Sequence, residues 1–288
     1  MSSSDGEAVE KKRSGVNLGA DFSIRAAAAV VLAAASLAIA WAGGFPFLAL
    51  WFAAGVGIVW EWQRLVGGER VELRVAAGAV ALLVASPFAL HADGALAGLV
   101  VAAGAVATGA LAEPGRRFEA GAGVVYAGVL AVGTNLLRAS PEYGLAVTLW
   151  LFAVVWGTDV MAYIGGRLIG GPKLWPSVSP GKTWSGAVVG AVTSAVFGAL
   201  VATLFSPSPI KFASMALFGL AISVVSQAGD LFESALKRRA GVKDSSHLIP
   251  GHGGLMDRLD GFVVAVALAT AIGYMRRTGL WIGSGLFL

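Results

Sequence analysis

The segment from Ser226 to Arg239 carries the densest set of residues able to do chemistry. If this segment is helical, its 3.6-residue period places the polar side chains along one stripe and the apolar ones elsewhere. A polar stripe on a helix that leaves a membrane needs partners, because charge that faces lipid is costly. The stripe therefore predicts a functional surface, formed by Ser226, Gln227, Asp230, Glu233, Ser234 and Lys237.

A second polar segment spans residues 243–260, with three glycines within 251–254 just before an apolar run. Glycine lets a ligand approach the backbone closely, and the N-terminus of a helix favours phosphate. Asp257 and Asp260 are three positions apart and share one helix face. Together with Asp230 they can place three carboxylates around one site. Such hard oxygen ligands suit Mg²⁺, which commonly takes one or two carboxylates plus substrate phosphates.

A third segment combines an intramembrane carboxylate with a polar loop. Asp159 and Tyr163 lie one helical turn apart near the end of an apolar run. An ionisable residue inside a membrane span is functional by default, although pairing of Asp159 with Arg167 remains an alternative. The loop that follows supplies good phosphate donors, namely Lys173, Lys182, Thr183 and Ser185.

Two nucleotide-binding motifs are excluded by single residues. The run Gly181-Lys182-Thr183 is similar to a P-loop, but Pro176 stands where its first glycine would be. A dinucleotide fingerprint starting at Gly251 lacks its third glycine, because Met256 occupies that position, and no strand precedes it. Any nucleotide site in this chain must therefore be of another kind.

The composition indicates an integral membrane protein. Of the 288 residues 57% are hydrophobic and only 13% are charged, and the mean hydropathy is +0.76. Soluble domains usually carry about 25% charged residues. The chain has no cysteine and three scattered histidines, which excludes disulfides, thiolate metal sites and a zinc cage.

The hydropathy pattern predicts an all-α polytopic protein. Residues 1–22 are expected to form a disordered tail, residues 23–144 the N-terminal membrane helices, and residues 145–288 a C-terminal catalytic region. The N-terminal spans carry almost no polar residues. Since a span needs roughly 20 apolar residues, nine are expected, near 25–42, 45–62, 74–90, 95–112, 120–137, 145–165, 185–205, 211–229 and 260–278.

The distribution of basic residues predicts the orientation of these spans. Lys and Arg are enriched in cytoplasmic segments of membrane proteins. If the N-terminal tail is cytoplasmic, the long polar loops 166–184 and 230–259 are cytoplasmic too. All 21 Lys and Arg residues then lie on that side except Arg138, Lys211, Arg276 and Arg277.

The polar segments resemble one enzyme family. Three strings are similar to the signature of phosphatidate cytidylyltransferases, namely S-Q-x-G-D-L-F-E-S-x-x-K-R, K-D and P-G-H-G-G-x-x-D-R-x-D. A second block of that family resembles the upstream string S-P-G-K-T-W-S-G. The resemblance covers about residues 155–262. It implies that CTP and phosphatidate react to CDP-diacylglycerol and pyrophosphate with Mg²⁺. It also implies a homodimer. The predicted cytoplasmic loops place the active site on the cytoplasmic face of the cytoplasmic (inner) membrane, where a water-soluble nucleotide can meet a lipid headgroup. No nucleic-acid partner is expected.

Roles for individual residues follow from this resemblance. Asp230, Asp257 and Asp260 are implied as metal ligands, and Lys237, Arg238 and Lys243 as partners of the nucleotide phosphates. Ser179 and Lys182 are implied in the substrate-binding loop. The remaining candidate substrate-binding residues are Asp159, Tyr163, Thr183, Ser226, Gln227, Glu233, Ser234, Asp244, His252, Gly253, Gly254 and Arg258.

Three alternatives remain open at this level. The carboxylates could instead be salt-bridge partners of Lys237, Arg238 and Arg258. An ion-coupled transporter also carries intramembrane carboxylates, but near mid-membrane and usually in inverted halves, whereas here the polar groups cluster in two loops. The third alternative is a related cytidylyltransferase that acts on a different lipid phosphate. A CDP-alcohol phosphotransferase does not fit the residues, because its Asp-Gly…Ala-Arg…Gly…Asp…Asp array is missing.

Overall fold

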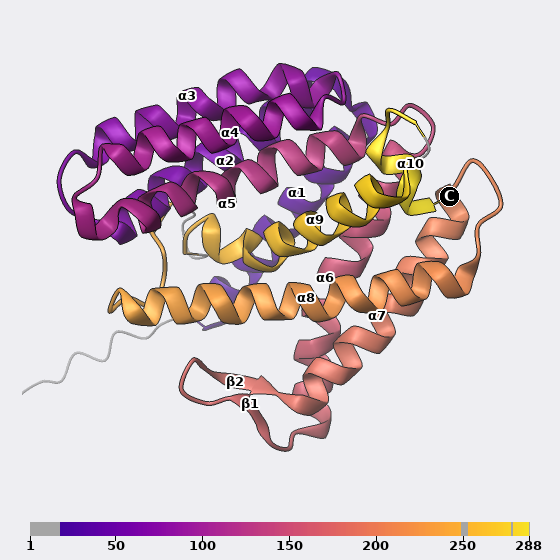
Figure 1. The fold of residues 1–288 in the computed structure, drawn as a ribbon. Coiled ribbons are helices and arrows are strands. Elements are labelled where there is room, and N and C mark those ends of the chain that lie inside the picture. Colours follow the sequence, from indigo (N-terminus) through magenta and orange to yellow (C-terminus); the bar gives the residue numbers. More distant parts are fainter. Residues whose placement is uncertain (1–17, 249–252, 278, 288) are drawn as a thin grey trace, which may run out of the picture. The chain divides into compact units, whose positions relative to one another are not determined.

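The described chain is almost entirely helical, which confirms the predicted all-α class (Figure 1). A computed structural model describes residues 18–248, 253–277 and 279–287. One short hairpin, formed by β1 and β2, interrupts the helices. The elements are α1 (Leu18–Ala42), α2 (Gly44–Val66), α3 (Val71–Leu90), α4 (Gly94–Ala110), the 3₁₀ helix η1 (Pro114–Arg116), α5 (Arg117–Arg138), α6 (Gly144–Ile169), β1 (Lys173–Trp175), β2 (Ser179–Thr183), α7 (Trp184–Phe205), α8 (Phe212–Arg239), α9 (Met256–Arg276) and α10 (Ile282–Phe287).

Every predicted span overlaps one of these helices. Seven of the helices within the described ranges are long and apolar enough to cross a membrane, namely α2, α3, α5, α6, α7, α8 and α9. Helix α4 is shorter, as is the apolar part of α1 from Val30 to Ala42, so the count of nine spans stays a prediction. Most of the predicted tail, residues 1–17, lies outside the described residues.

Aromatic side chains join the early helix α2 to helices α6 and α9. Trp51 of α2 stacks on Phe262 of α9, with ring centroids 5.0 Å apart and an interplanar angle of 15°. Phe152 of α6 packs against both rings, and all three side chains are buried. Large aromatic surfaces contribute strongly to packing. Helices α2, α6 and α9 are therefore held together at this cluster.

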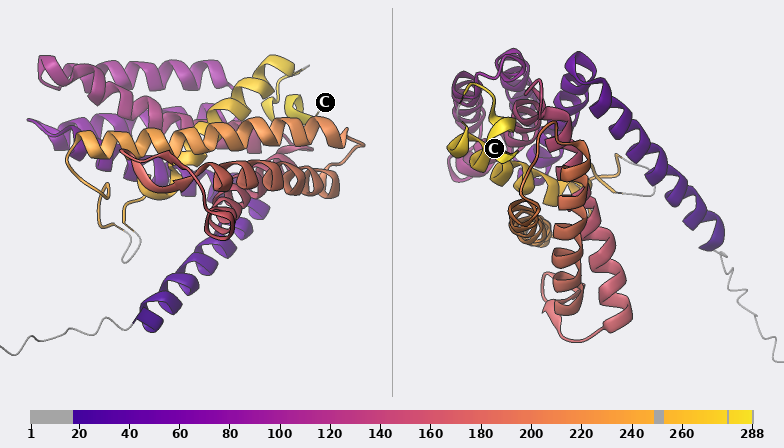
Figure 2. Two further views of the ribbon diagram at one scale, coloured as in Figure 1. Left: turned by 90° about the horizontal axis from the view of Figure 1, so that it is seen from below. Right: turned by 90° about the vertical axis from the view of Figure 1, so that its right-hand side faces the viewer.

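Helices α6 and α7 pack closely because small residues line their contact. A Cβ atom on Gly190 of α7 would lie 2.8 Å from the carbonyl oxygen of Thr158 in α6, which leaves no room for a larger side chain. Small residues allow such close approach between membrane helices. Figure 2 shows α6 and α7 side by side, with the β hairpin at their common end. Part of the expected polar loop 166–184 is thus an ordered antiparallel hairpin, in which Lys173 pairs with Thr183.

Three buried hydroxyls connect α6, α7 and α8. Thr158 Oγ1 lies 2.6 Å from Ser223 Oγ and 3.1 Å from Ser194 Oγ, and all three side chains are fully buried. We expect Thr158→Val to lower the free energy of unfolding by about 1 kcal/mol, the usual scale for interhelical hydrogen bonds in membranes. Thermal unfolding in detergent measures the change.

Thr193→Val provides the matched control for that substitution. Thr193 Oγ1 donates back to the carbonyl of Val189 in its own helix at 2.6 Å, so its loss leaves the α6–α8 contact intact. Equal destabilisation by the two substitutions would contradict a role of the Thr158 cluster in joining the helices.

Candidate active site

A cavity of about 890 Å³ lies where α6, the β hairpin and α7 meet α8 and α9. Ten of the predicted site residues line it, although they come from segments far apart in the sequence. Asp230 and Asp257 are both among them, so the two carboxylates share one cavity. The ten residues are Asp159, Tyr163, Lys182, Thr183, Gln227, Asp230, Lys237, Asp257, Arg258 and Asp260.

The ordered continuation of α8 positions the polar stripe. Helix α8 runs unbroken to Arg239, so residues 226–237 have the helical period that the stripe requires. The stripe faces α9 and the cavity: Ser226 and Glu233 are buried, and Gln227, Asp230 and Lys237 line the cavity. Phe232, on another face of the same helix, is exposed.

Lys237 lies between two carboxylates. Its Nζ atom is 2.6 Å from Glu233 Oε2 and 2.6 Å from Asp257 Oδ1. The Lys237 side chain is 12% exposed and the Glu233 side chain 1% exposed, so water screens the pairs little. One cation is thus shared by two acidic groups.

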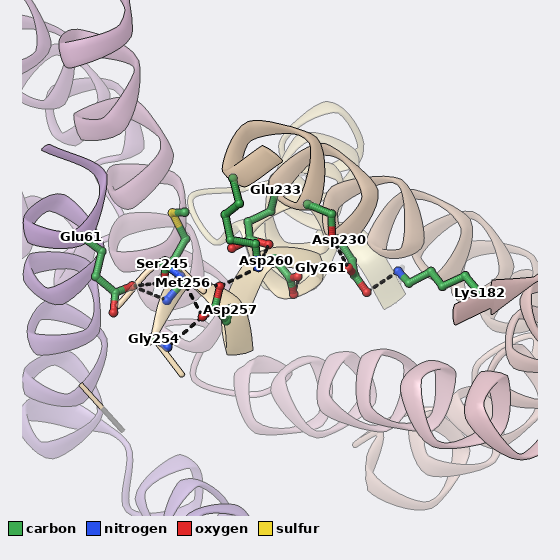
Figure 3. A network of polar contacts seen from close by, with 12 residues as sticks. Glu61, Lys182, Asp230, Glu233, Ser245, Gly254, Met256, Asp257, Asp260 and Gly261 are labelled. Atoms are coloured by element: carbon green, nitrogen blue, oxygen red, sulfur yellow. Dashed lines mark hydrogen bonds and ion pairs between the residues drawn. The ribbon is translucent and has the colours of Figure 1, made fainter. Parts of the chain in front are cut away.

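Asp257 is also held by the backbone that precedes α9. Its Oδ2 atom accepts hydrogen bonds from the N–H groups of Gly254 at 2.8 Å and Ser245 at 3.0 Å (Figure 3). Gly253 has φ +83°, a left-handed conformation that favours glycine, and a Cβ there would lie 2.8 Å from Asp257 Oδ2. The glycines of this segment thus allow the backbone to wrap around the Asp257 carboxylate.

A second ion pair connects the hairpin to α8. Lys182 of β2 pairs with Asp230 Oδ2 (Figure 3). Ser234 Oγ donates to Asp230 Oδ1 at 3.4 Å. Thr183 caps α7, since its Oγ1 accepts the N–H of Gly186 at 3.1 Å. Lys182 and Thr183 are consecutive, so the cap fixes the point from which Lys182 reaches the cavity.

The structure separates other candidates from the cavity. Arg238, Lys243 and Asp244 are exposed, and Ser179 is half-buried in the hairpin. Gly253 and Gly254 act through the backbone beside Asp257, and Ser226 and Glu233 are buried in the packing of α8. His252 lies outside the described residues.

One residue at this site was missed by the sequence analysis. Glu61 of α2 is fully buried, and its carboxylate accepts hydrogen bonds from the segment that precedes α9. The N-terminal spans were expected to carry almost no polar residues. The signal was nevertheless present, because a carboxylate inside an apolar span is itself an indication of function.

Comparison with known proteins identifies the family. A family model described as cytidylyltransferase family matches residues 23–275. A phosphatidate cytidylyltransferase of Brucella abortus biovar 1 (strain 9-941) is 41% identical over 247 residues, which cover 85% of this chain and 90% of that protein. The chain belongs to the cytidylyltransferase family.

Other members of the cytidylyltransferase family match over shorter stretches. The phosphatidate cytidylyltransferase of Haemophilus influenzae is 42% identical over 144 residues, or 49% of this chain and 50% of that protein. That of Bacillus subtilis is 43% identical over 127 residues, or 44% of this chain and 47% of that protein. Membership of an enzyme family decides against the ion-coupled transporter.

The donor set of this cytidylyltransferase suits a divalent cation without forming a complete cage. Asp159, Asp230 and Asp260 bring like charges to one cavity, and carboxylate oxygens are the ligands that Mg²⁺ prefers. Within the described ranges, no three acidic, His or Cys side chains are already arranged to hold a metal ion. Mg²⁺ usually binds one or two carboxylates and takes its other ligands from water and substrate phosphates.

Proposed function

We propose that this member of the cytidylyltransferase family is a phosphatidate cytidylyltransferase, which makes CDP-diacylglycerol and pyrophosphate from CTP and phosphatidate in phospholipid biosynthesis. The observation that carries the proposal is the cavity at one end of α6–α9, where carboxylates and cations from membrane helices face each other. The 41% identity to a protein of that name over 85% of the chain supports it.

The chemistry joins two anions. A phosphate oxygen of phosphatidate attacks the α-phosphorus of CTP, a new P–O bond forms, and the bond to the β-phosphate breaks so that pyrophosphate leaves with the electron pair. The attacking oxygen is already anionic, so no general base is needed. The activation barrier comes from repulsion between the two anionic substrates and from the negative charge that develops on the leaving pyrophosphate. Fixed positive charge in the site lowers both contributions to the barrier.

Residues of this chain provide that positive charge and hold it in place. Lys182 and Lys237 line the cavity and are each oriented by carboxylates, Asp230 for Lys182 and Asp257 for Lys237. Side chains fixed by such pairs need little reorganisation when the substrates bind. We propose that the two lysines contact the phosphates of the bound substrates.

We further propose that Asp230 and Asp260 hold Mg²⁺ together with the substrate phosphates. When bound, the ion neutralises phosphate charge and positions the reacting groups. Asp257 is the third candidate ligand. Its oxygens already accept hydrogen bonds from Lys237, Ser245 and Gly254, so coordination by Asp257 requires one of these donors to be replaced. The same holds for Asp230, whose oxygens are contacted by Lys182 and Ser234.

The place of the site in the cell follows from its substrates. CTP is water-soluble and phosphatidate is a lipid, so the cavity must open at the membrane surface. Exposed apolar side chains next to the cavity, such as Leu168 and Trp184, suit an opening towards lipid. We propose that this is the cytoplasmic face of the inner membrane, and that the enzyme is a homodimer as the family resemblance implies.

The proposal is tested with the purified protein and labelled CTP. We expect label to move into a chloroform-soluble product only when both phosphatidate and Mg²⁺ are present, with pyrophosphate released in equal amount. Omission of Mg²⁺ should abolish turnover, because the repulsion between the phosphates of the two substrates then lacks the divalent charge that offsets it.

Two results would change the assignment. Label transfer to a different lipid phosphate in preference to phosphatidate would favour the alternative, a cytidylyltransferase for another lipid phosphate. Release of pyrophosphate without a lipid product, at the same rate with and without phosphatidate, would contradict transfer to a lipid altogether.

A further inference from the structure

We propose that Glu61 of α2 is a positioning residue that holds the backbone before α9 and, through it, the Lys237–Asp257 pair at the cavity. This inference rests on the proposed function for its kinetic part. It assigns a role in catalysis to the N-terminal helices, in which the sequence analysis placed no functional residue.

The contacts of Glu61 carry the first step. Oε1 accepts hydrogen bonds from Ser246 Oγ at 2.6 Å and from the N–H of Leu255 at 2.7 Å. Oε2 accepts from the N–H of Met256 at 2.6 Å and from Ser245 Oγ at 3.2 Å (Figure 3). A fully buried carboxylate is costly unless it is hydrogen-bonded, and here four donors meet it. The four donors belong to Ser245, Ser246, Leu255 and Met256.

Ser245 links Glu61 to the Lys237–Asp257 pair. Its hydroxyl donates to Glu61 Oε2, and its backbone N–H donates to both oxygens of Asp257, at 3.1 and 3.0 Å. Gly254 lies at the same junction: its N–H binds Asp257, and a Cβ on it would be 2.7 Å from Glu61 Oε1. The segment is therefore clamped between two carboxylates, one on α2 and one on α9.

The helix that carries Glu61 is a rigid support. Two residues further on, Gln63 is also fully buried, and its Nε2 donates to the carbonyl of Ala120 in α5 at 2.8 Å. Trp51 of the same helix stacks on Phe262 of α9. A site is held precisely when its supporting groups sit on packed elements. Because Glu61 is fixed on α2, its hydrogen bonds fix Ser245, which in turn binds Asp257.

The kinetic test compares Glu61→Ala with Glu61→Gln. We expect Glu61→Ala to lower kcat by about 10²-fold, the scale of a misplaced catalytic group, while KM for CTP and for phosphatidate stays within about threefold. The kcat of Glu61→Gln should lie between those of the parent protein and Glu61→Ala. The amide oxygen of the glutamine still accepts two hydrogen bonds, but its NH₂ group faces a backbone N–H and cannot accept one. Gln63→Ala is the matched control: it removes a buried polar anchor from the same helix but no contact to residues 245–256.

A second readout does not depend on activity. The chain has no cysteine, so His247→Cys gives one exposed site for a nitroxide label within the held segment. We expect the label to become more mobile when Glu61→Ala is added, and clearly less so when Gln63→Ala is added, because Gln63→Ala keeps all four hydrogen bonds of Glu61. A label at Ser177→Cys, in the turn of the hairpin, should be unaffected by both.

The two readouts separate the possible failures. An unchanged His247→Cys label in Glu61→Ala would overturn the inference, as would a mobile label with kcat within threefold of the parent. A kcat loss in Glu61→Ala no greater than in Gln63→Ala would also overturn it. If the parent protein makes no lipid product, the proposed function fails, and the label alone still decides whether Glu61 holds the segment.

Discussion

Asp257→Asn is expected to insert and fold but to lose turnover by roughly 10²–10³-fold, the range seen when one electrostatic stabiliser is removed from an active site. Folding should survive because Lys237 keeps its second partner, Glu233, at 2.6 Å. Turnover should be lost, because Lys237 loses the charged carboxylate that orients it and the cavity loses a fixed charge. The measurement is kcat with saturating Mg²⁺, together with thermal unfolding in detergent.

Asp93→Asn is the control for this substitution. Asp93 also accepts a backbone N–H at the start of a helix, that of Leu96 in the first turn of α4 at 3.0 Å, but it does not line the catalytic cavity. Asparagine caps helices as well as aspartate does, so activity should be unchanged. Near-normal turnover in Asp257→Asn would remove Asp257 from the catalytic set.

Lys237→Met is expected to have the largest effect on stability. It leaves Glu233 and Asp257 facing each other without their shared cation, and both carboxylates are largely buried. Breaking a buried ion pair from one side costs about 3–5 kcal/mol, because a charge remains uncompensated. We therefore expect a clearly lower unfolding temperature as well as loss of turnover.

The double variant Lys237→Met/Glu233→Gln separates the two effects. Removing one of the opposed charges should restore part of the stability, while turnover should stay lost because the cation is still missing. Arg64→Gln serves as the comparison, because it breaks an exposed ion pair. The side chains of Arg64 and Glu72 are 54% and 75% exposed, and such surface pairs contribute about 0–1 kcal/mol to the free energy of unfolding. A Lys237→Met protein as stable as Arg64→Gln would contradict the role given to the buried cluster.

These substitutions also answer the alternative that the carboxylates are only salt-bridge partners. The structure shows that Asp257 and Asp230 do pair with lysines, and that both pairs line the cavity. Structural pairing and catalysis are therefore not exclusive here. An ion pair that only stabilises the fold would lose stability and activity together, whereas Asp257→Asn is expected to lose activity alone.

The sequence by itself determined the class of the protein and most of its candidate residues. Composition and hydropathy predicted membrane helices, because a bilayer requires long apolar segments whatever the rest of the chain does. The helical period predicted the stripe from Ser226 to Lys237, since α8 is regular throughout. The spacing of Asp257 and Asp260 predicted a shared helix face, and both line the cavity. Each of these depends on local geometry.

Only the tertiary structure decided which of these residues act on each other. Lys182 pairs with Asp230, Ser245 and Gly254 bind Asp257, and Ser245 and Met256 bind Glu61. These contacts join segments that no local period relates. Such contacts depend on how helices pack, and packing is set by small residues and aromatic clusters spread over the whole chain. Glu61 was therefore visible in the sequence as a carboxylate in an apolar run, but its partners were not.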